Sequence, residues 1–179
     1  SHEYMVLTMV PGMDGVAAMQ TLPPKQLVSL LAEGLRVVHT VDISGCPFDE
    51  SLPTKLHYAR VNVQRGLVDE DDFDEERQGW TANQVLQALL ESQPPEDDPV
   101  FCHGDYCLPN ILFQHNRISG YIDFDRGGVS DRYNDLAIAS RSIRFNLSPS
   151  WEEIFFDFYG IDKVDWERID YYRMMDELF

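Results

Sequence analysis

Three polar residues, Asp105, Asn110 and Asp123, place the strongest constraint on how this chain can fold. Asp105 and Asn110 lie five positions apart in one segment, where Pro109 fixes φ and removes an N–H group, so the segment resists joining a helix. Residues 111–122 read as two short strands with a turn between them. Folding these strands together brings Asn110 close to Asp123. The sequence therefore predicts a loop and a hairpin that gather two carboxylates and one amide.

The side chains in this set fit phosphoryl transfer to a hydroxyl group. A carboxylate can accept the proton of the attacking hydroxyl, and an amide with a second carboxylate offers the hard oxygen ligands that Mg²⁺ prefers. In protein kinases, the motifs H-R-D-x-x-x-x-N and D-F-G provide a base and two magnesium ligands in this order. A single Asp in a loop is more often a turn former, but the ordered combination favours function. We therefore interpret Asp105 as the catalytic base, and Asn110 and Asp123 as ligands of Mg²⁺.

Three further residues near this set are expected to support it or to lie outside the chemistry. His103 is expected to hold the loop in place rather than to exchange protons. Asp135 precedes the apolar run 136–139, which predicts the start of a buried helix. Because a buried ionised carboxylate is costly unless its oxygens accept hydrogen bonds, we expect Asp135 to bind helix-capping N–H groups and the backbone around His103. For Asp125 we favour a solvated turn residue over a second metal ligand.

The balance of charge indicates the class of ligand. The chain has 14 basic and 31 acidic residues and a formal net charge of −17, which repels nucleic acids and anionic membranes and attracts polycations. The densest acidic run, residues 69–76, has an ordinary explanation as a solvated loop, which is compatible with ligand binding. Since one exposed ammonium–carboxylate contact contributes only about 0–1 kcal/mol, tight binding of a polycation needs several contacts in one cleft.

Helical periodicity dominates the rest of the chain and predicts a mainly helical α+β fold. We expect helices from Lys25 to His39, from a cap at Thr81 to the residues before Pro94, from segment 148–150 to Gly160, and from Asp165 onwards. No apolar run approaches the ~20 residues that span a bilayer. The three cysteines are an odd number without metal-ligand spacing, which favours a cytoplasmic location.

Motifs along almost the whole chain resemble those of the C-terminal portion of the aminoglycoside 3′-phosphotransferases, the kanamycin and neomycin kinases of resistant bacteria. The catalytic-loop motifs are shared with choline and homoserine kinases, whereas the acidic C-terminus and the segment around Arg126 narrow the assignment. The segments that carry the resemblance are 46–48, 66–70, 103–110, 120–123, Arg126 with 131–133, and 176–179.

The resemblance implies a protein kinase-like fold, of which this chain is the C-terminal catalytic and substrate-binding lobe, with ATP and Mg²⁺ as cofactors. It implies the roles given above for Asp105, Asn110 and Asp123, and it puts Arg126 beside the phosphoryl group and the aminoglycoside. Leu108 and the pair 145–146 stand where some relatives carry acidic ligands, a departure that affects the range of drugs. The groups expected to meet the substrate's ammonium substituents are Asp72, Glu75, Glu76, Asp176, Glu177 and the Phe179 carboxylate.

The N-terminal segment is expected to join this lobe to a second one. Residues 4–12 read as a strand and a turn, and they resemble the interlobe hinge, in which the backbone at Met9 and Val10 meets adenine. We divide the chain into a hinge, 1–12, and a catalytic lobe, 13–179. Upstream we find no Gly-rich phosphate loop, no strand lysine and no helix glutamate. We therefore expect the N-terminal ATP lobe of the same protein to be absent and this chain to be inactive alone.

The expected reaction is ATP-dependent phosphorylation of an aminoglycoside hydroxyl, the 3′-hydroxyl by resemblance, which confers resistance. Two other functions stay open at this stage. The first is a different small-molecule kinase that acts on choline or an amino sugar. The second is a non-catalytic module whose acidic cleft sequesters polycations. Assays across these substrates, and replacement of Asp105, separate the three.

Overall fold

The computed structural model describes residues 8–95 and 97–179, and helices predominate in it, as the sequence predicts. The strand expected near residues 4–10 falls mostly outside the described residues, and residues 8–11 form neither helix nor strand. In the described part of the chain, no helix is both long and apolar enough to cross a membrane. The helical elements are α1 (Gly15–Ala18), α2 (Pro24–His39), α3 (Leu52–Arg65), α4 (Ala82–Glu91), α5 (Arg132–Asn146), α6 (Ser150–Tyr159), α7 (Trp166–Asp176) and the 3-10 turns η1 (Glu70–Asp72) and η2 (Leu108–Asn110).

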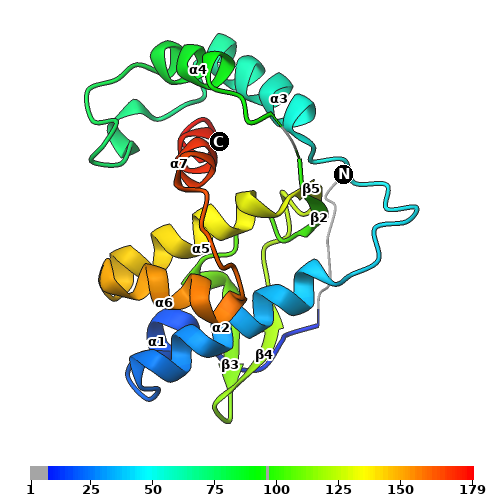
Figure 1. Cartoon of the computed structure of the whole chain (residues 1–179), viewed down its shortest axis with the longest axis vertical. Coiled ribbons are helices and arrows are strands. Elements are labelled where there is room, and N and C mark those ends of the chain that lie inside the picture. Colours follow the sequence, from blue (N-terminus) through cyan, green and yellow to red (C-terminus); the bar gives the residue numbers. More distant parts are fainter. Residues whose placement is uncertain (1–7, 96) are drawn as a thin grey trace, which may run out of the picture.

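The predicted hairpin is confirmed as β3 (Ile111–Gln114) and β4 (Arg117–Tyr121), joined by a two-residue turn. Both turn residues, His115 and Asn116, have positive φ of 52° and 60°, as a type I′ turn requires. β1 (Met13–Asp14) pairs with the other edge of β3, so the antiparallel sheet has the order β1-β3-β4. This sheet extends below α1 and α2 in Figure 1.

A second antiparallel pair, which the sequence did not predict, joins β2 (Pro99–Cys102) to β5 (Gly128–Asp131). The segment between these two strands contains residues 103–107, which we call the catalytic loop, followed by η2 and the β3-β4 hairpin. Because β2 and β5 are hydrogen-bonded to each other, they hold the two ends of this segment together. The pair thus closes the region in which Asp105, Asn110 and Asp123 lie.

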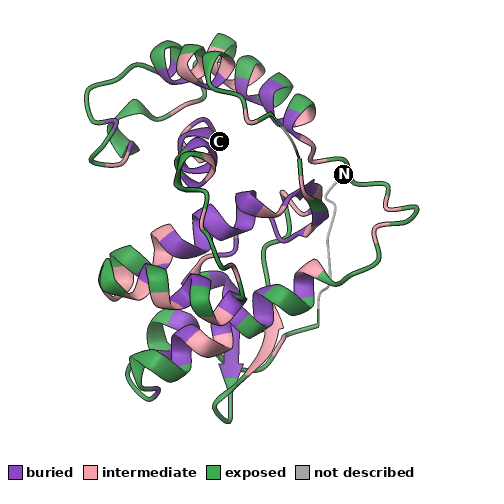
Figure 2. Cartoon of the chain, in the orientation of Figure 1, coloured by how far each residue is buried: buried purple, intermediate pink, exposed green. Residues whose placement is uncertain are grey.

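Helix α5 forms the centre of the fold. Residues 133–140 are all buried, and in Figure 2 the buried colour runs along α5, whereas α3 and α4 alternate between buried and exposed positions. α6 and α7 both pack against α5, and α2 packs against α6. α5 carries buried polar residues, among them Asn134, Asp135 and Ser140, so polar and apolar positions do not separate into two faces. That explains why the sequence indicated only a helix start near Asp135, whereas α5 begins at Arg132 and is capped by Asp131.

The predicted helix ends agree with the structure at most positions. Thr81 forms a capping box with Gln84 at the start of α4, and Asp165 caps α7 by accepting a hydrogen bond from the backbone of Arg168. Gly160 ends α6 with a φ of 95°. α6 begins in the predicted segment 148–150 but has no side-chain cap, because the hydroxyls of Ser148 and Ser150 bond to each other at 2.7 Å.

Gly34 allows α2 to approach the β3-β4 hairpin closely. A Cβ built on Gly34 would lie 2.3 Å from Cδ1 of Ile118 and 2.7 Å from the hydroxyl oxygen of Tyr106. That hydroxyl donates to the Leu31 carbonyl at 2.9 Å, and the hydroxyl of Tyr121 donates to the Gly34 carbonyl at 3.2 Å. Tyr121 therefore ties α2 to the hairpin, and Tyr106 ties α2 to the loop between β2 and η2, at the place where no side chain intervenes.

We expect Gly34→Ala to destabilise the fold, although alanine is favoured over glycine in a helix by about 1 kcal/mol. Overpacking costs about 1–3 kcal/mol, and displacing the Tyr106 hydroxyl costs about another 1 kcal/mol. The midpoint of urea unfolding should therefore fall, whereas Glu33→Ala at the exposed neighbouring position should leave it nearly unchanged. A Gly34→Ala variant as stable as the wild type would contradict this account.

Candidate active site

Asp105 lies in the loop between β2 and η2, and its carboxylate is oriented by Asn110. The side-chain amide nitrogen of Asn110 donates to Oδ2 of Asp105 at 2.7 Å and to its backbone carbonyl at 3.1 Å. The backbone N–H of Asp105 donates to Nδ1 of His103 at 3.3 Å. The carboxylate is therefore held by its own loop, and it is half-buried at the wall of a cavity.

The hairpin brings Asp123 next to Asn110. The backbone N–H of Ile122 donates to the Asn110 carbonyl at 3.0 Å, and the chain then turns at Asp123, which has a φ of 64°. The amide nitrogen of Asn110 is engaged by Asp105, so the amide oxygen is the atom available to a cation, and the exposed carboxylate of Asp123 supplies further oxygens. Hard oxygen donors of this kind fit Mg²⁺.

Asp135 fixes the backbone of the catalytic loop. Its Oδ2 accepts a hydrogen bond from the N–H of His103 at 2.7 Å, and its Oδ1 accepts one from the N–H of Gly104 at 2.9 Å. This carboxylate is fully buried, and burial by itself raises its pKa. The hydrogen bond and charge of His39, together with the two backbone N–H donors, have a larger effect, so the pKa of Asp135 is lowered. Asp135 therefore stays ionised and anchors the loop.

His39, the last residue of α2, is a site residue that sequence reasoning missed. Its Nε2 lies 3.2 Å from Oδ2 of Asp135, and its Nδ1 lies 2.7 Å from the hydroxyl of Tyr159. The two ring nitrogens of His39 therefore connect Asp135 to Tyr159. Its only sequence signal is its place at the end of a periodic helix, which does not distinguish it from any other helix end.

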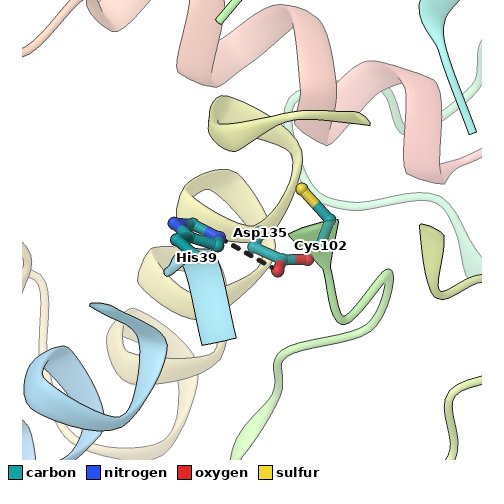
Figure 3. A group of neighbouring side chains, drawn as sticks. All are labelled: His39, Cys102 and Asp135. Carbon is teal, nitrogen blue, oxygen red and sulfur yellow. Dashed lines mark hydrogen bonds and ion pairs between the residues drawn. The ribbon is translucent and has the colours of Figure 1, made fainter. Parts of the chain in front are cut away.

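The thiol of Cys102 joins His39 and Asp135 in a group whose ligand atoms lie within 4.8 Å of one another, as Figure 3 shows. We interpret this group as a structural anchor rather than a metal centre. Both oxygens of Asp135 already accept backbone N–H groups, and burial raises the pKa of the Cys102 thiol well above its usual value, which disfavours the thiolate that a metal requires.

His103 packs the catalytic loop against its surroundings. Its ring is fully buried against Phe124, with ring centroids 4.2 Å apart, and burial lowers its pKa, so it is neutral at pH 7. Gly104 follows with a φ of 91°, and a Cβ built on it would lie 2.1 Å from the carbonyl oxygen of Arg126. Only glycine fits this contact. The close approach joins the catalytic loop directly to the backbone of Arg126.

A cavity of about 980 Å³ connects this loop to the acidic parts of the chain. Its walls come from the loop between α3 and α4, from α5 and from the end of α7. The structure therefore brings together residues that lie more than a hundred positions apart in the sequence. The predicted residues that line it are Asp72, Glu75, Glu76, Asp105, Arg126, Asp176, Glu177 and Phe179. Asp74, Arg141 and Phe145 also line it and were not predicted as site residues.

Asp176 holds two arginines at the wall of this cavity. Its Oδ1 accepts a hydrogen bond from Nη1 of Arg126 at 2.7 Å, and its Oδ2 is bound by Nη2 of Arg141. Burial opposes ionisation, but the two guanidinium groups outweigh it and lower the pKa of Asp176. The guanidinium of Arg126 also lies 5.6 Å from the centre of the Phe179 ring. Asp176 therefore positions Arg126, and both of its oxygens are already engaged.

Glu177 differs from Asp176 because a second carboxyl group, that of Asp74, lies close to it. Its side chain is buried, and Oε1 accepts a hydrogen bond from the backbone N–H of Asp74 at 3.3 Å. Burial, followed by the adjacent carboxyl group of Asp74, raises the pKa of Glu177 to about 7. Near pH 7 this carboxyl group is therefore only partly ionised.

Met9 and Val10, the predicted adenine-binding positions, lie beside the hairpin and do not line the cavity. Met9 is 86% exposed, and the Val10 side chain lies against Gly120 in β4. Next to them, the hydroxyl of Ser119 donates to the Pro11 carbonyl at 2.6 Å. The structure thus puts this segment on the hairpin that carries the metal-ligand candidates, and its contact with adenine stays a prediction.

Comparison with known proteins agrees with this geometry. Residues 1–172 match the phosphotransferase enzyme family. The chain belongs to this family. An aminoglycoside 3′-phosphotransferase of Niallia circulans is 39% identical over 178 residues, which cover 99% of this chain and 68% of the relative. One of Streptomyces fradiae is also 39% identical, over 98% of this chain and 68% of its own length. The family member described here thus spans about two thirds of the length of these relatives.

Solved structures of family members have the same fold. A crystal structure of a type VIII aminoglycoside 3′-phosphotransferase, 34% identical, superimposes with a TM-score of 0.86 and covers 96% of this chain and 67% of its own. An aminoglycoside phosphotransferase of Streptomyces rimosus in complex with ADP and streptomycin, 29% identical, gives a TM-score of 0.81 over 95% of this chain and 68% of its own. The predicted kinase-like fold and the predicted family resemblance are confirmed.

We expect Asp135→Ala to cost stability as well as activity. It leaves the N–H groups of His103 and Gly104 without their acceptor, and each unsatisfied buried donor costs about 1–3 kcal/mol. Urea unfolding should report a loss of about 3 kcal/mol or more, whereas Asp125→Ala at an exposed turn should change little. An Asp135→Ala protein with wild-type stability but no activity would argue against the anchoring role.

Proposed function

We propose that the protein catalyses ATP-dependent phosphorylation of an aminoglycoside hydroxyl, the 3′-hydroxyl by homology, and thereby confers resistance. The observation that carries this proposal is the cavity that joins Asp105 to the carboxylates of the α3-α4 loop and of the C-terminus. A base beside a metal-ligand pair suits phosphoryl transfer, and an acidic wall suits a substrate with several ammonium groups. The aminoglycoside 3′-phosphotransferases of Niallia circulans and Streptomyces fradiae support the choice of substrate class.

In the proposed reaction, the substrate hydroxyl oxygen attacks the γ-phosphorus of ATP and its proton passes to Asp105. ADP leaves with the electron pair of the broken P–O bond. Asn110 and Asp123 would hold Mg²⁺, which when bound offsets charge on the phosphate oxygens. Asn110 also keeps the Asp105 carboxylate in one orientation through the hydrogen bond at 2.7 Å. Arg126, held by Asp176, offers a fixed positive charge near the base.

The substrate's ammonium groups would be shared among several carboxylates. Asp72, Glu75 and Glu76 line the cavity from the α3-α4 loop, and Glu177 with Phe179 lines it from the C-terminus. Each contact at an exposed carboxylate is weak, so affinity depends on engaging several at once in a cleft that is partly closed to water. We propose that Asp176 contributes through Arg126, since both of its oxygens are engaged.

The nucleotide would approach from the side of the hairpin. We propose that residues 1–12 act as the interlobe hinge, with the backbone of Met9 and Val10 against adenine, and that residues 13–179 form the catalytic and aminoglycoside-binding lobe. The complex of the Streptomyces rimosus relative with ADP supports nucleotide binding by this chain's full-length protein. We propose a cytoplasmic location, where ATP is available and where Cys46, Cys102 and Cys107, all free in the structure, stay reduced.

Asp105→Asn in the full-length protein should abolish most of the activity and leave binding nearly intact. General-base catalysis typically contributes 10²–10⁴-fold, so we expect kcat for kanamycin to fall by about that factor while the Kd for kanamycin changes by less than about threefold. Bacteria that express the variant should lose resistance. Resistance that survives the substitution would instead support a module that only sequesters polycations.

The 179-residue chain by itself should bind kanamycin but consume ATP at a negligible rate. Phosphoryl transfer depends on positioning the nucleotide, and the chain contains no Gly-rich loop or strand lysine for that task. Calorimetry should detect binding, and a coupled ADP-release assay should remain at background. Drug-dependent turnover at ordinary kinase rates of about 1–100 s⁻¹ would contradict this expectation.

A further inference from the structure

Arg77, in the loop between α3 and α4, lies at the centre of four carboxylates. Its side chain is 5% exposed, and Nη1 donates to both carboxylate oxygens of Asp74, at 3.1 and 2.9 Å. Nη2 donates to Oδ1 of Asp170 at 2.5 Å and to the Asp170 carbonyl at 3.4 Å. Nη1 also lies 3.7 Å from Oε2 of Glu76 and 3.8 Å from Oε1 of Glu177.

These contacts connect two elements that are distant in the sequence. Asp74 and Glu76 belong to the α3-α4 loop, whereas Asp170 lies in α7 and Glu177 follows it. Figure 1 shows this loop, in green, beside the red α7. In addition to Arg77, the backbone contact between Asp74 and Glu177 joins the same two elements. Arg77 therefore supplies the cation at the junction of the acidic loop with the C-terminal helix.

The position of Arg77 relative to the cavity indicates what this junction does. Asp74, Glu76 and Glu177 line the cavity, whereas Arg77 and Asp170 do not. The guanidinium thus lies behind the acidic wall, with Asp170, which is 56% exposed, as its anchor on the outer side. A group in this place does not contact a ligand in the cavity. It sets where the carboxylates that do contact the ligand are held.

Charge balance gives the physical reason. Without Arg77, four carboxylates from two elements would face one another with no cation between them, and like charges at such distances repel each other or retain a proton. Either outcome weakens a wall that binds ammonium groups, because the carboxylates move apart or become neutral. If the loss of Arg77 acted only by making the cavity more negative, it would strengthen cation binding. The positioning role predicts weaker binding, so the two explanations predict opposite changes in Kd.

We propose that Arg77 is a positioning residue that holds the acidic wall of the cavity in its cation-binding arrangement. The proposal rests on the proposed function, since it assumes a polycationic substrate in this cavity. It goes further by assigning substrate affinity to a buried cation that does not touch the substrate.

The proposal includes a dependence on pH. The charged groups that face the pair of Asp74 and Glu177 are Glu76 and Arg77 from the loop, Asp170 from α7 and Arg141 from α5. With Arg77 present, the pKa of Glu177 is about 7. Removal of a positive charge raises the pKa of a nearby carboxyl group further, so Glu177 is more protonated near pH 7 and ionises again at higher pH. The loss of affinity should therefore be largest near neutrality.

The test is calorimetric titration of the chain with kanamycin, for the wild type, Arg77→Gln, Arg77→Lys and a matched control, Arg36→Gln. Arg36 is exposed on α2, does not line the cavity, and its replacement changes net charge equally. At pH 7 we expect Arg77→Gln to raise Kd about tenfold. Arg77→Lys should raise Kd less, because the charge is kept while the two-pronged contact is lost. The control should match the wild type.

The ratio of the Kd of Arg77→Gln to that of the wild type should be smaller at about pH 8.5 than at pH 7, because a larger fraction of Glu177 is then ionised in both proteins. The ligand's own titration cancels in this ratio. If Arg77→Gln fails to fold, Asp170→Asn, which removes only the outer anchor, should still raise Kd about threefold. Equal or tighter kanamycin binding by folded Arg77 variants would overturn the proposal. No kanamycin binding by the wild type would overturn the proposed function with it.

Discussion

The buried carboxylate of Asp135 is the contact on which the rest of the site depends. It accepts the backbone N–H groups of His103 and Gly104, and His39 supports it from the end of α2. Because Asp135 belongs to the central helix α5, the catalytic loop is attached to the most buried element of the fold. The loop's own hydrogen bonds, from Asn110 to Asp105 above all, then set the orientation of the Asp105 carboxylate. A fixed orientation supports the proposed role of Asp105 as the base, since positioning and electrostatics provide most of the catalysis in phosphoryl transfer.

Electrostatic balance determines how the acidic wall of the cavity is arranged. A cavity lined by many carboxylates attracts a polycation, but the same carboxylates repel one another when the cavity is empty. The structure meets this constraint by placing arginines behind or beside the acidic wall. Asp176 binds Arg126 and Arg141, and Arg77 joins carboxylates of the α3-α4 loop to those of α7. In the proposed function, the formal charge of −17 forms a binding surface because a few buried or half-buried cations arrange the carboxylates.

Much of the fold could be predicted from the sequence where local signals are strong. The β3-β4 hairpin, the amphipathic α2, the capping box at Thr81 and the cap at Asp165 all follow from residues within a few positions of one another. The β2-β5 pair could not be predicted in this way, because it joins strands separated by the whole catalytic segment. The extent of α5 could not be predicted from periodicity either, because Asn134, Asp135 and Ser140 are buried with its apolar residues and no apolar stripe marks one face.

The sequence by itself determined the family of the chain and the groups on which its proposed chemistry rests: the candidate base, the candidate oxygen ligands for a metal, and the acidic loop and C-terminus. These depend on residue type and on short spacing, which no packing arrangement changes. Only the tertiary structure decided which charges meet. His39 contacts Asp135, which is 96 positions away in the sequence, and Arg77 contacts Asp170, which is 93 positions away. Such pairs form because helix packing brings the side chains together in a buried setting, where an unpaired charge is costly. Nothing in the neighbourhood of either residue in the sequence records that partner.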